Sequence, residues 1–401
     1  MTDLTICVPT RNRQRYCIET VKALAQNEGR DFEVVVADNS DDPSILADFF
    51  ANDFHDDRFR LLPPGERVYS MVDNWERTIP ETAGRWVVVI GDDDYIDPRV
   101  TGLLKHFEKL YKGVEAIGWN RMNFNWPDNR SRATLATVPC TFKVAVARKS
   151  SDQDRLFRWT EKQRRPAAGF GIYHGAVKRS LMDRIKRKYG NRYFEHPNVD
   201  YESSCKVIAE AKVMVHCQRG FSVLGACASS NSAGTQSRKA MQERTNQFLQ
   251  ETRDNIPTEH PDFPFPLSSE VLSICVGVAH TTFWFCKTYG IDLTGFPENF
   301  AGSAMKECAN ALTEEEYDLK VSSFRKSFAA WDDGKWASHF NPAPYAPGER
   351  ILNELSGVVG EVLYLSESKL KAKTPAEFYH FAEHAMLPVE LVVSGARTFA
   401  R

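Results

Sequence analysis

The chain has 401 residues, of which 42% are apolar and 26% are charged, and its formal net charge is −2. This is the composition of an ordinary globular protein with one large domain and a smaller one, and it gives no electrostatic sign of a nucleic-acid binder. Nine scattered cysteines without a C-x-x-C pair argue against a zinc cluster and against a disulfide framework. We therefore expect reduced thiols, no nucleic-acid partner and a cytoplasmic location.

Short apolar runs of β-forming residues recur along the first part of the chain, separated by helical patterns. The first begins at residue 4, which leaves no room for a signal peptide. The runs are LTICV (4–8), FEVVVAD (32–38), FRLLPP (59–64) and WVVVI (86–90). Because they are apolar on both faces and alternate with helices, they predict a parallel sheet covered by helices, and hence an α/β fold.

Polar residues collect where three of these runs end. Thr10 and Arg11 follow the first run, Asp38 and Asn39 follow the second, and three aspartates at 92–94 follow the fourth. Ligands of open parallel sheets bind at the carboxyl ends of the strands. These residues are therefore expected to converge on one site.

The run GDDDYIDP places Asp92, Asp93 and Asp94 next to one another. Carboxylates this close repel one another and raise each other's pKa unless a positive partner lies among them. That partner could be a metal ion or a Lys or Arg side chain, and a solvated acidic turn is the plainer interpretation. Such carboxylates bind Mg²⁺ or Mn²⁺ together with substrate phosphates, so a metal ion is the partner we expect.

From about residue 240 the pattern changes to helices. The apolar run at 271–287 is too short and too polar for a membrane span, so we expect a buried helix there. Thr313 and Glu316 form a capping box that predicts the start of another helix. We therefore predict an α/β domain at 1–240 and a helical region at 241–401, which serves acceptor, membrane-surface or oligomer contacts, a homodimer included.

Three segments together resemble the family 2 glycosyltransferases of the GT-A fold. They are TICVPTRNR, VVVADNSDD and MVDNWERTIPETAGRWVVVIGDDDYIDP, and the resemblance extends over roughly residues 4–235. It implies a GT-A α/β domain in an inverting hexosyltransferase-type enzyme that uses Mn²⁺ or Mg²⁺. Such an enzyme moves a sugar from a nucleotide-diphosphate sugar to a hydroxyl acceptor.

The resemblance also assigns residues to the donor. The nucleotide would be held by Pro9, Thr10, Arg11, Asp38 and Asn39. The DxD-type turn would bind the metal ion and the donor diphosphate, but three adjacent aspartates leave its register open. We favour Asp93 as the metal ligand, supported by Asp94, with Asp92 toward the ribose. Asp92 and Asp94 could instead form the metal-binding pair.

Inverting members of the family also need a general base, usually an aspartate in an acidic motif that opens a helix. The segment HPNVDYESSCKVIAEA (196–211) fits this place, with Asp200 as the base and Glu202 as a second catalytic carboxylate. Val199 stands where many members carry a glutamate. Acidic residues placed at a helix N-terminus for its dipole are the alternative interpretation.

Two further segments carry expected contacts. GFGIYHGAVKRS (169–180) resembles the acceptor-side stretch of these enzymes and supplies Tyr173 and His174, although His174 could equally be a packed structural histidine. LGACASSNSAGTQSRK (224–239) has the composition of a lid that orders over a bound donor, or of a plain loop. The phosphate or sugar contacts expected within it are Ser230, Asn231 and Ser232.

Other functions remain open on the sequence alone. A nucleotidyltransferase also places metal-binding aspartates at a strand end, but PTRNRQR lacks the glycine of its phosphate loop. A catalytically inactive nucleotide- or sugar-binding relative should have lost part of the carboxylate set, yet Asp38, Asp200 and the three adjacent aspartates are present. No G-x-G-x-x-G follows a strand, which disfavours a dinucleotide-binding oxidoreductase.

The acceptor is indicated only by a basic cluster at 184–188 and by the helical region. We expect a glycan or a lipid-linked sugar, as in bacterial surface polysaccharide or glycolipid synthesis, with peripheral contact at the inner membrane face. A solvated basic helix face is the alternative. The base and sugar of the donor cannot be read from the sequence.

Overall fold

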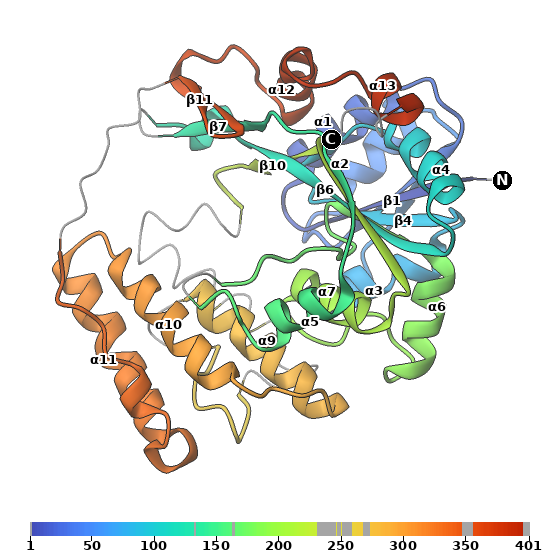
Figure 1. The fold of residues 1–401 in the computed structure, drawn as a ribbon. Helices are drawn as coiled ribbons and strands as arrows, with labels where there is room; N and C mark the ends of the chain where they lie inside the picture. Colours follow the sequence, from blue (N-terminus) through green and yellow to red (C-terminus); the bar gives the residue numbers. More distant parts are fainter. Residues whose placement is uncertain are drawn as a thin grey trace.

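The computed structural model describes residues 2–131, 134–162, 165–230, 259–267, 273–346 and 356–395, together with the single residues 246 and 250. Figure 1 shows a twisted sheet flanked by helices, with a group of helices set against one side of it. The α/β fold predicted from the sequence is confirmed.

The strands run along most of the described chain and join a single sheet. They are β1 (Leu4–Thr10), β2 (Phe32–Asp38), β3 (Phe59–Leu62), β4 (Trp86–Val89), β5 (Tyr95–Ile96), β6 (Val114–Asn125), β7 (Leu135–Pro139), β8 (Val144–Val146), β9 (Gly175–Lys178), β10 (Val213–Ala226), β11 (Gly357–Val359) and β12 (Val362–Ser366). The main path through the sheet is β11-β12-β7-β6-β9-β4-β1-β2-β3.

The four predicted strands form the parallel part of the sheet, in the order β4-β1-β2-β3. Leu4 pairs with Phe32 on one side and with Trp86 on the other, and this register brings Thr10 opposite Asp38. Strand β9 lies antiparallel between β4 and β6, and β6 runs parallel to β10. The sheet is therefore mixed, because these later strands extend a parallel core.

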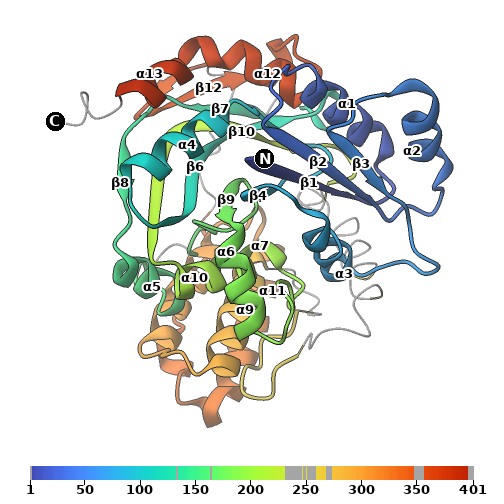
Figure 2. The same ribbon diagram turned by 90° about the vertical axis from the view of Figure 1, so that its right-hand side faces the viewer.

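The helices cover both faces of the sheet. They are α1 (Gln14–Ala25), α2 (Ser44–Asp48), α3 (Met71–Glu76), α4 (Val100–Leu110), α5 (Lys149–Phe157), α6 (Arg179–Lys188), α7 (Val199–Glu210), α9 (Ile274–Tyr289), α10 (Phe296–Ala309), α11 (Glu314–Ala330), α12 (Pro375–Ala382) and α13 (Val389–Gly395). Figure 2 shows α12 and α13 above the sheet and α9, α10 and α11 below it.

Alternate residues of each central strand enter different hydrophobic cores. On β1, Ile6 packs with residues of α1, α4, α12 and α13, whereas Cys7 faces α3, α6 and α7. This is the period of two expected for a strand that is buried on both faces. A third core joins α9, α10 and α11 through aromatic side chains such as Phe300, Phe324 and Trp331. Those aromatics therefore stabilise the helical region.

The C-terminal half matches the predicted helices and adds strands that the pattern did not indicate. Helix α9 is buried as expected, and no helix in the described ranges is long and apolar enough to cross a membrane. The side chain of Thr313 caps α11 by accepting a hydrogen bond from the amide of Glu316. After α11 the chain returns to the sheet, where β12 pairs with β7. The division at residue 240 stays a prediction.

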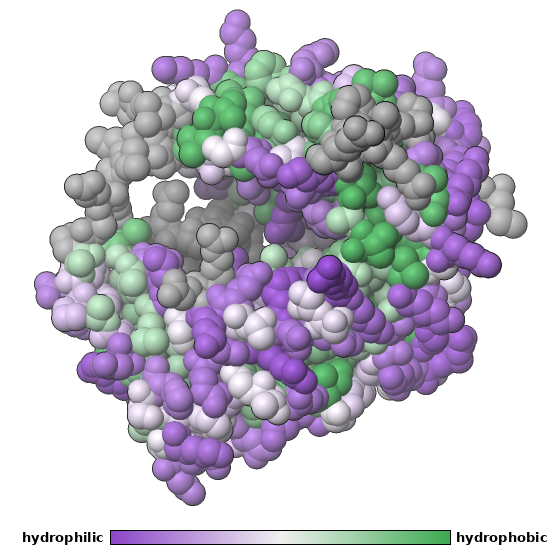
Figure 3. Space-filling model, viewed as in Figure 1, coloured by the Kyte–Doolittle hydropathy of each residue, from purple (hydrophilic) through white to green (hydrophobic). Residues whose placement is uncertain are grey.

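Two features of the surface are relevant to the predicted contact with a membrane: exposed apolar side chains and the basic cluster on α6. Figure 3 shows apolar side chains gathered over β11 and α12, where Val358, Val359 and Phe381 are exposed. The basic cluster on α6 is largely paired within the domain. Its ion pairs are Arg184 with Glu115, Lys186 with Glu76, and Lys188 with Glu210. These pairings weaken the case for an anionic membrane partner, which stays a prediction.

Candidate active site

The carboxyl ends of β1, β2 and β4 meet at one edge of the sheet, as expected from the parallel register. There the hydroxyl of Thr10 donates a 2.6 Å hydrogen bond to Asp92. Thr20, on α1, donates to the backbone carbonyls of Asp92 and Asp94 at 2.9 and 3.0 Å. The turn at 92–94 is therefore fixed to the loop and helix that follow β1.

The positive partner of the three aspartates in this structure is Arg13. Its guanidinium lies 2.8 Å and 3.1 Å from the two carboxylate oxygens of Asp92, and its Nη1 lies 3.5 Å from Oδ1 of Asp93. Asp92 is fully buried, which raises the pKa of its carboxyl, and Arg13 counteracts this rise. Arg13 thus offsets the charge repulsion within the turn.

Asp94 already accepts hydrogen bonds at both oxygens. Oδ1 accepts from the amide of Gly225 at 2.7 Å. Oδ2 accepts from the amide of Gly91 at 2.6 Å, from the Tyr173 hydroxyl at 2.8 Å and from Nε2 of His174 at 2.9 Å. Burial acts to raise the pKa of Asp94, but His174, Gly225 and Tyr173 together lower it below its usual value. These hydrogen bonds hold the turn in place through Asp94.

His174 belongs to a buried polar chain that fixes its proton. Nδ1 lies 2.8 Å from the Ser222 hydroxyl, which itself accepts a hydrogen bond from Trp119 at 3.0 Å. Ser222 can therefore donate to Nδ1, which leaves the proton on Nε2 for Asp94. The predicted acceptor residues Tyr173 and His174 thus contact the aspartate turn, and their acceptor role stays a prediction.

Asp93 faces the segment that follows β10. Its Oδ2 accepts hydrogen bonds from the amide of Cys227 at 3.2 Å and from the hydroxyl of Ser230. Its carbonyl accepts from the indole of Trp126 at 2.9 Å. Ser230 thus contacts the turn, but its expected contact with the donor stays a prediction. Asn231 and Ser232 lie outside the described residues. Oδ1 of Asp93 is loosely held, because its hydrogen bond from Nη1 of Arg13 is 3.5 Å long.

The loop at 169–174 joins the turn to the helix that carries Asp200. The amide of His174 donates to the carbonyl of Val89 at 3.1 Å, and the amide of Ile172 donates to the Ser203 hydroxyl on α7 at 3.1 Å. His174 has a φ of 54°, in the left-handed region that costs energy for a residue with a side chain. This strained loop fixes the N-terminus of α7 against the aspartate turn.

Asp200 and Glu202 have different surroundings in the first turn of α7. Glu202 is fully buried, lies 2.7 Å from Lys206, and accepts from the amides of Glu195 and His196. Asp200 is partly exposed, and within the described residues no other side chain donates a hydrogen bond to its carboxylate. Burial raises its pKa. Glu202 therefore fixes a loop, while Asp200 is available to a ligand.

The predicted nucleotide side has one carboxylate oxygen without a partner. Asp38 is fully buried; its Oδ1 accepts from the amide of Ser40 at 2.9 Å, and its Oδ2 has no hydrogen-bond partner among the described residues. Asn39 exchanges two 2.8 Å hydrogen bonds with the backbone of Tyr69. Arg11 donates to the carbonyl of Asn39 at 3.0 Å. A buried, unsatisfied acceptor is costly, so a ligand donor at Asp38 would stabilise the site.

The protein side chains of the turn do not by themselves provide a complete set of ligands for a divalent ion. Within the described ranges no three His, Cys, Asp or Glu side chains are arranged to hold a metal ion. Mg²⁺ and Mn²⁺ commonly bind through one or two carboxylates together with substrate phosphates and water. Asp93, with one loosely held oxygen, is the residue of the turn that fits this kind of site, whereas Asp92 is paired with Arg13.

A comparison with family models identifies the domain. Residues 5–177 match the model described as glycosyl transferase family 2. This part of the chain is a family 2 glycosyltransferase domain. The expectation of such a glycosyltransferase, with a GT-A-like α/β fold, is thereby confirmed.

Among solved structures, S. aureus TarS 1–349 is 14% identical with a TM-score of 0.41, and the match covers 84% of this chain and 89% of that one. Its complex with UDP-GlcNAc gives 14% identity, a TM-score of 0.43 and the same coverages. The mannosyltransferase PcManGT from Pyrobaculum calidifontis, in complex with GDP-Man and Mn²⁺, is 16% identical with a TM-score of 0.37 and covers 84% of each chain. No curated protein matches the chain.

Several side chains at the site of the family 2 domain were not predicted from the sequence. Arg13 is the second arginine of TRNR, and nothing in the sequence distinguishes it from Arg11. Trp126 and Ser222 lie on or next to long strands and reach the turn only because β6 and β10 pair in parallel. The sequence contains one indication of such a residue: the mutual repulsion of three adjacent aspartates predicts a cation close to them.

Proposed function

We propose that this protein transfers a sugar from a nucleotide-diphosphate sugar to a hydroxyl group of an acceptor, with inversion at the anomeric carbon. The observation that carries the proposal is the juxtaposition, in a family 2 domain, of the aspartate turn with the N-terminus of α7. A donor bound at the turn would then have a carboxylate, that of Asp200, on a neighbouring element.

The donor nucleotide would lie across the ends of β1 and β2. The free Oδ2 of Asp38 supports this placement, because it is a buried acceptor suited to a ribose hydroxyl or a base N–H. Thr10 and Arg11 border the same edge. Asp92 would stay paired with Arg13, which counteracts the rise that burial causes in the pKa of its carboxyl.

The donor diphosphate would meet the turn at Asp93. Mn²⁺ or Mg²⁺ bound there, when present, would offset the charge that develops on the departing diphosphate. We propose Asp93 as the principal ligand, because one of its oxygens is loosely held. Asp94 would act by fixing the turn, since both of its oxygens already accept hydrogen bonds.

Asp200 would act as the general base. Its carboxylate receives no hydrogen bond from another side chain within the described residues, and burial raises its pKa, which makes it a stronger proton acceptor than an exposed aspartate. The proton of the attacking hydroxyl passes to Asp200 as its oxygen bonds to the anomeric carbon, and the bond from that carbon to the diphosphate breaks. We propose a glycan or a lipid-linked sugar as the acceptor, as in bacterial surface polysaccharide or glycolipid synthesis.

The reaction can be tested without knowing the acceptor, because water can replace it. The protein is incubated with UDP-, GDP-, TDP- and CDP-sugars and Mn²⁺, and the products are followed by mass spectrometry and proton NMR. We expect slow release of a nucleoside diphosphate from one donor and a sugar whose initial anomeric configuration is opposite to that of the donor. Retained configuration would contradict inversion. Turnover of nucleoside triphosphates with release of pyrophosphate would favour a nucleotidyltransferase.

A further inference from the structure

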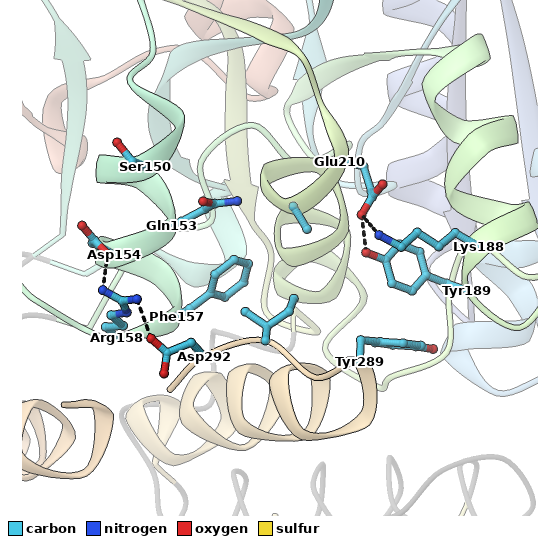
Figure 4. A pocket seen from close by; sticks show the side chains of 12 residues that line it. Ser150, Gln153, Asp154, Phe157, Arg158, Lys188, Tyr189, Glu210, Tyr289 and Asp292 are labelled. Carbon is cyan, nitrogen blue, oxygen red and sulfur yellow. Dashed lines mark hydrogen bonds and ion pairs between the residues drawn. The ribbon is translucent and has the colours of Figure 1, made fainter. Parts of the chain in front are cut away.

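A cavity lies away from the aspartate turn, where α5, α6 and α7 meet α9 of the helical region. Its volume is about 510 Å³, within the range of small-molecule sites. Figure 4 shows side chains from α5, from the C-terminal ends of α6 and α7, and from the end of α9 converging on it. Glu210 lines the cavity at the last residue of α7, whereas Asp200 is the second. At 1.5 Å per helical residue they are about 15 Å apart.

The polar walls of this junction cleft are two groups of paired charges on opposite sides. On one side Arg158 lies 3.1 Å from Asp154 and also pairs with Asp292. On the other side Lys188 and the Tyr189 hydroxyl each lie 2.6 Å from Glu210. Three acidic and two basic groups leave one excess negative charge, which disfavours a phosphate or another anionic ligand.

The middle of the cleft is less polar. Phe157 lies between the two charged walls, and the half-buried Tyr289 lies beside Tyr189 on the wall of Glu210, as Figure 4 shows. From α5 the amide of Gln153 points toward this middle. Within the described part of the chain no hydrogen bond joins that amide to another group, so both its donor and its acceptor are available to a ligand.

We propose that the junction cleft binds an uncharged saccharide, as a second contact for the acceptor of the glycosyl transfer proposed above. Hydroxyl groups of a sugar both donate and accept, so they can bridge a carboxylate and a neighbouring cation without adding charge. The partly exposed ring of Tyr289 beside the polar walls suits the apolar face of a sugar ring. That the saccharide is the acceptor rests on the proposed function. That the ligand is an uncharged saccharide rests on the residues that line the cleft.

The test uses an array of immobilised oligosaccharides, both neutral and anionic, probed with the labelled full-length protein in the absence of nucleotide. Gln153→Trp fills the cleft, and Gln153→Ala removes the free amide while leaving it open. Ser151→Trp is the matched control, because it adds the same side chain to an exposed position of the same helix that does not line the cavity. Asp93→Ala reports on the donor site.

We expect the wild type, Ser151→Trp and Asp93→Ala to bind the same neutral oligosaccharide, and Gln153→Trp to bind it at least tenfold more weakly. Weaker binding by Gln153→Ala at an unchanged melting temperature would exclude a folding defect. Binding to no oligosaccharide, or only to anionic ones, would overturn the proposal. So would unchanged binding by Gln153→Trp. Donor cleavage by the wild type alongside any of these results would leave the proposed function standing, so that the two failures are distinguishable.

Discussion

Arg13 balances the negative charge of the aspartate turn. Replacing it should therefore lower the stability of the folded protein. Arg13→Gln leaves the fully buried Asp92 without a cation. Breaking one side of a buried ion pair costs about 3–5 kcal/mol. We expect a loss in the free energy of unfolding that approaches this size as the pH rises above 7, where the Asp92 carboxyl, whose pKa is raised to about 7, is ionised in the wild type. Urea denaturation at pH 7 and above measures it.

Arg11→Gln is the matched control for this prediction. Arg11 lies two residues away and pairs at 3.4 Å with Asp41, whose side chain is 63% exposed. An exposed pair contributes about 0–1 kcal/mol, so this variant should lie close to the wild type in stability. Equal losses in both variants would mean that Arg13 does not stabilise the turn through Asp92.

Asp200 gives the second prediction at this scale. Asp200→Asn removes the group that accepts the proton, so donor binding should persist while transfer to a hydroxyl falls by a factor of at least about 100. In the wild type, kcat/KM should fall as the pH drops through the raised pKa of Asp200, because only the ionised carboxylate is active. Nucleotide release at different pH values measures both effects. Undiminished turnover by Asp200→Asn would exclude it as the base.

The sequence predicted which side chains lie at the same edge of the sheet, but it did not predict the hydrogen bonds that each of them forms. Thr10, Asp38 and the three aspartates converge as predicted, because a parallel register brings strand ends together. The individual hydrogen bonds depend on rotamers and on partners distant in the chain. Glu202 shows this most clearly: its ion pair with Lys206 is an i,i+4 pair of one helix, whereas its complete burial and its hydrogen bonds from the amides of Glu195 and His196 depend on how α7 packs.

At the scale of elements, β10 packs against the aspartate turn so closely that only a glycine fits at 225. A Cβ atom there would lie 1.7 Å from the carbonyl oxygen of Asp93. Gly225→Ala should therefore move β10 away from the turn and break the hydrogen bond from its amide to Asp94. We expect a destabilisation of about 1–3 kcal/mol in urea denaturation and a loss of nucleotide binding in calorimetry.

Gly220→Ala tests the same strand without the clash, because its nearest atoms would lie 3.4 Å or more from the new Cβ. It should retain stability and binding. If both variants behaved like the wild type, the close contact between β10 and the turn would be wrong.

The elements themselves were predictable to different degrees. Strands β1, β2 and β4 and helix α11 carried continuous apolar runs or a capping box, and they appear where expected. Strands β11 and β12 were missed because they are short and lie after a long helical region. They are strands because they pair with β7, which is a tertiary contact that no local pattern encodes.

At the scale of the whole molecule, a buried histidine pair links helix α9 of the helical region to the segment that precedes α7. Nε2 of His196, just before α7, lies 3.1 Å from Nδ1 of His280 on α9. Burial lowers the pKa of His280 to about 4, and His260 adds to this effect. Burial also lowers the pKa of His196 well below its usual value, and His280 and Lys206 add to it. Both rings are therefore neutral in the folded protein at neutral pH.

This pair predicts a pH dependence of stability. The unfolded chain protonates these histidines below about pH 6.5, but the folded protein binds those protons only at lower pH. The free energy of unfolding should therefore fall as the pH drops from about 6.5 toward 4, by about 1.4 kcal/mol per pH unit for each histidine. Urea denaturation at several pH values measures this slope.

His280→Phe should reduce the dependence of the unfolding free energy on pH by the contribution of one histidine. The control His384→Gln changes an exposed histidine and should leave that dependence unchanged. An unchanged slope in His280→Phe would show that the contact between His196 and α9 does not link the two regions in solution.

The measurement that tests the central claim most directly is a thermal-shift panel of UDP, GDP, TDP and CDP, each with and without Mn²⁺, on the wild type and Asp93→Ala. A ligand at 100 times its Kd stabilises the folded state by about 2.7 kcal/mol, which corresponds to a shift of a few degrees for a chain of this size. We predict that one nucleotide raises the melting temperature of the wild type in the presence of Mn²⁺ and leaves that of Asp93→Ala unchanged. Equal shifts in both proteins would contradict the assignment of the aspartate turn as the site of the metal ion and the diphosphate.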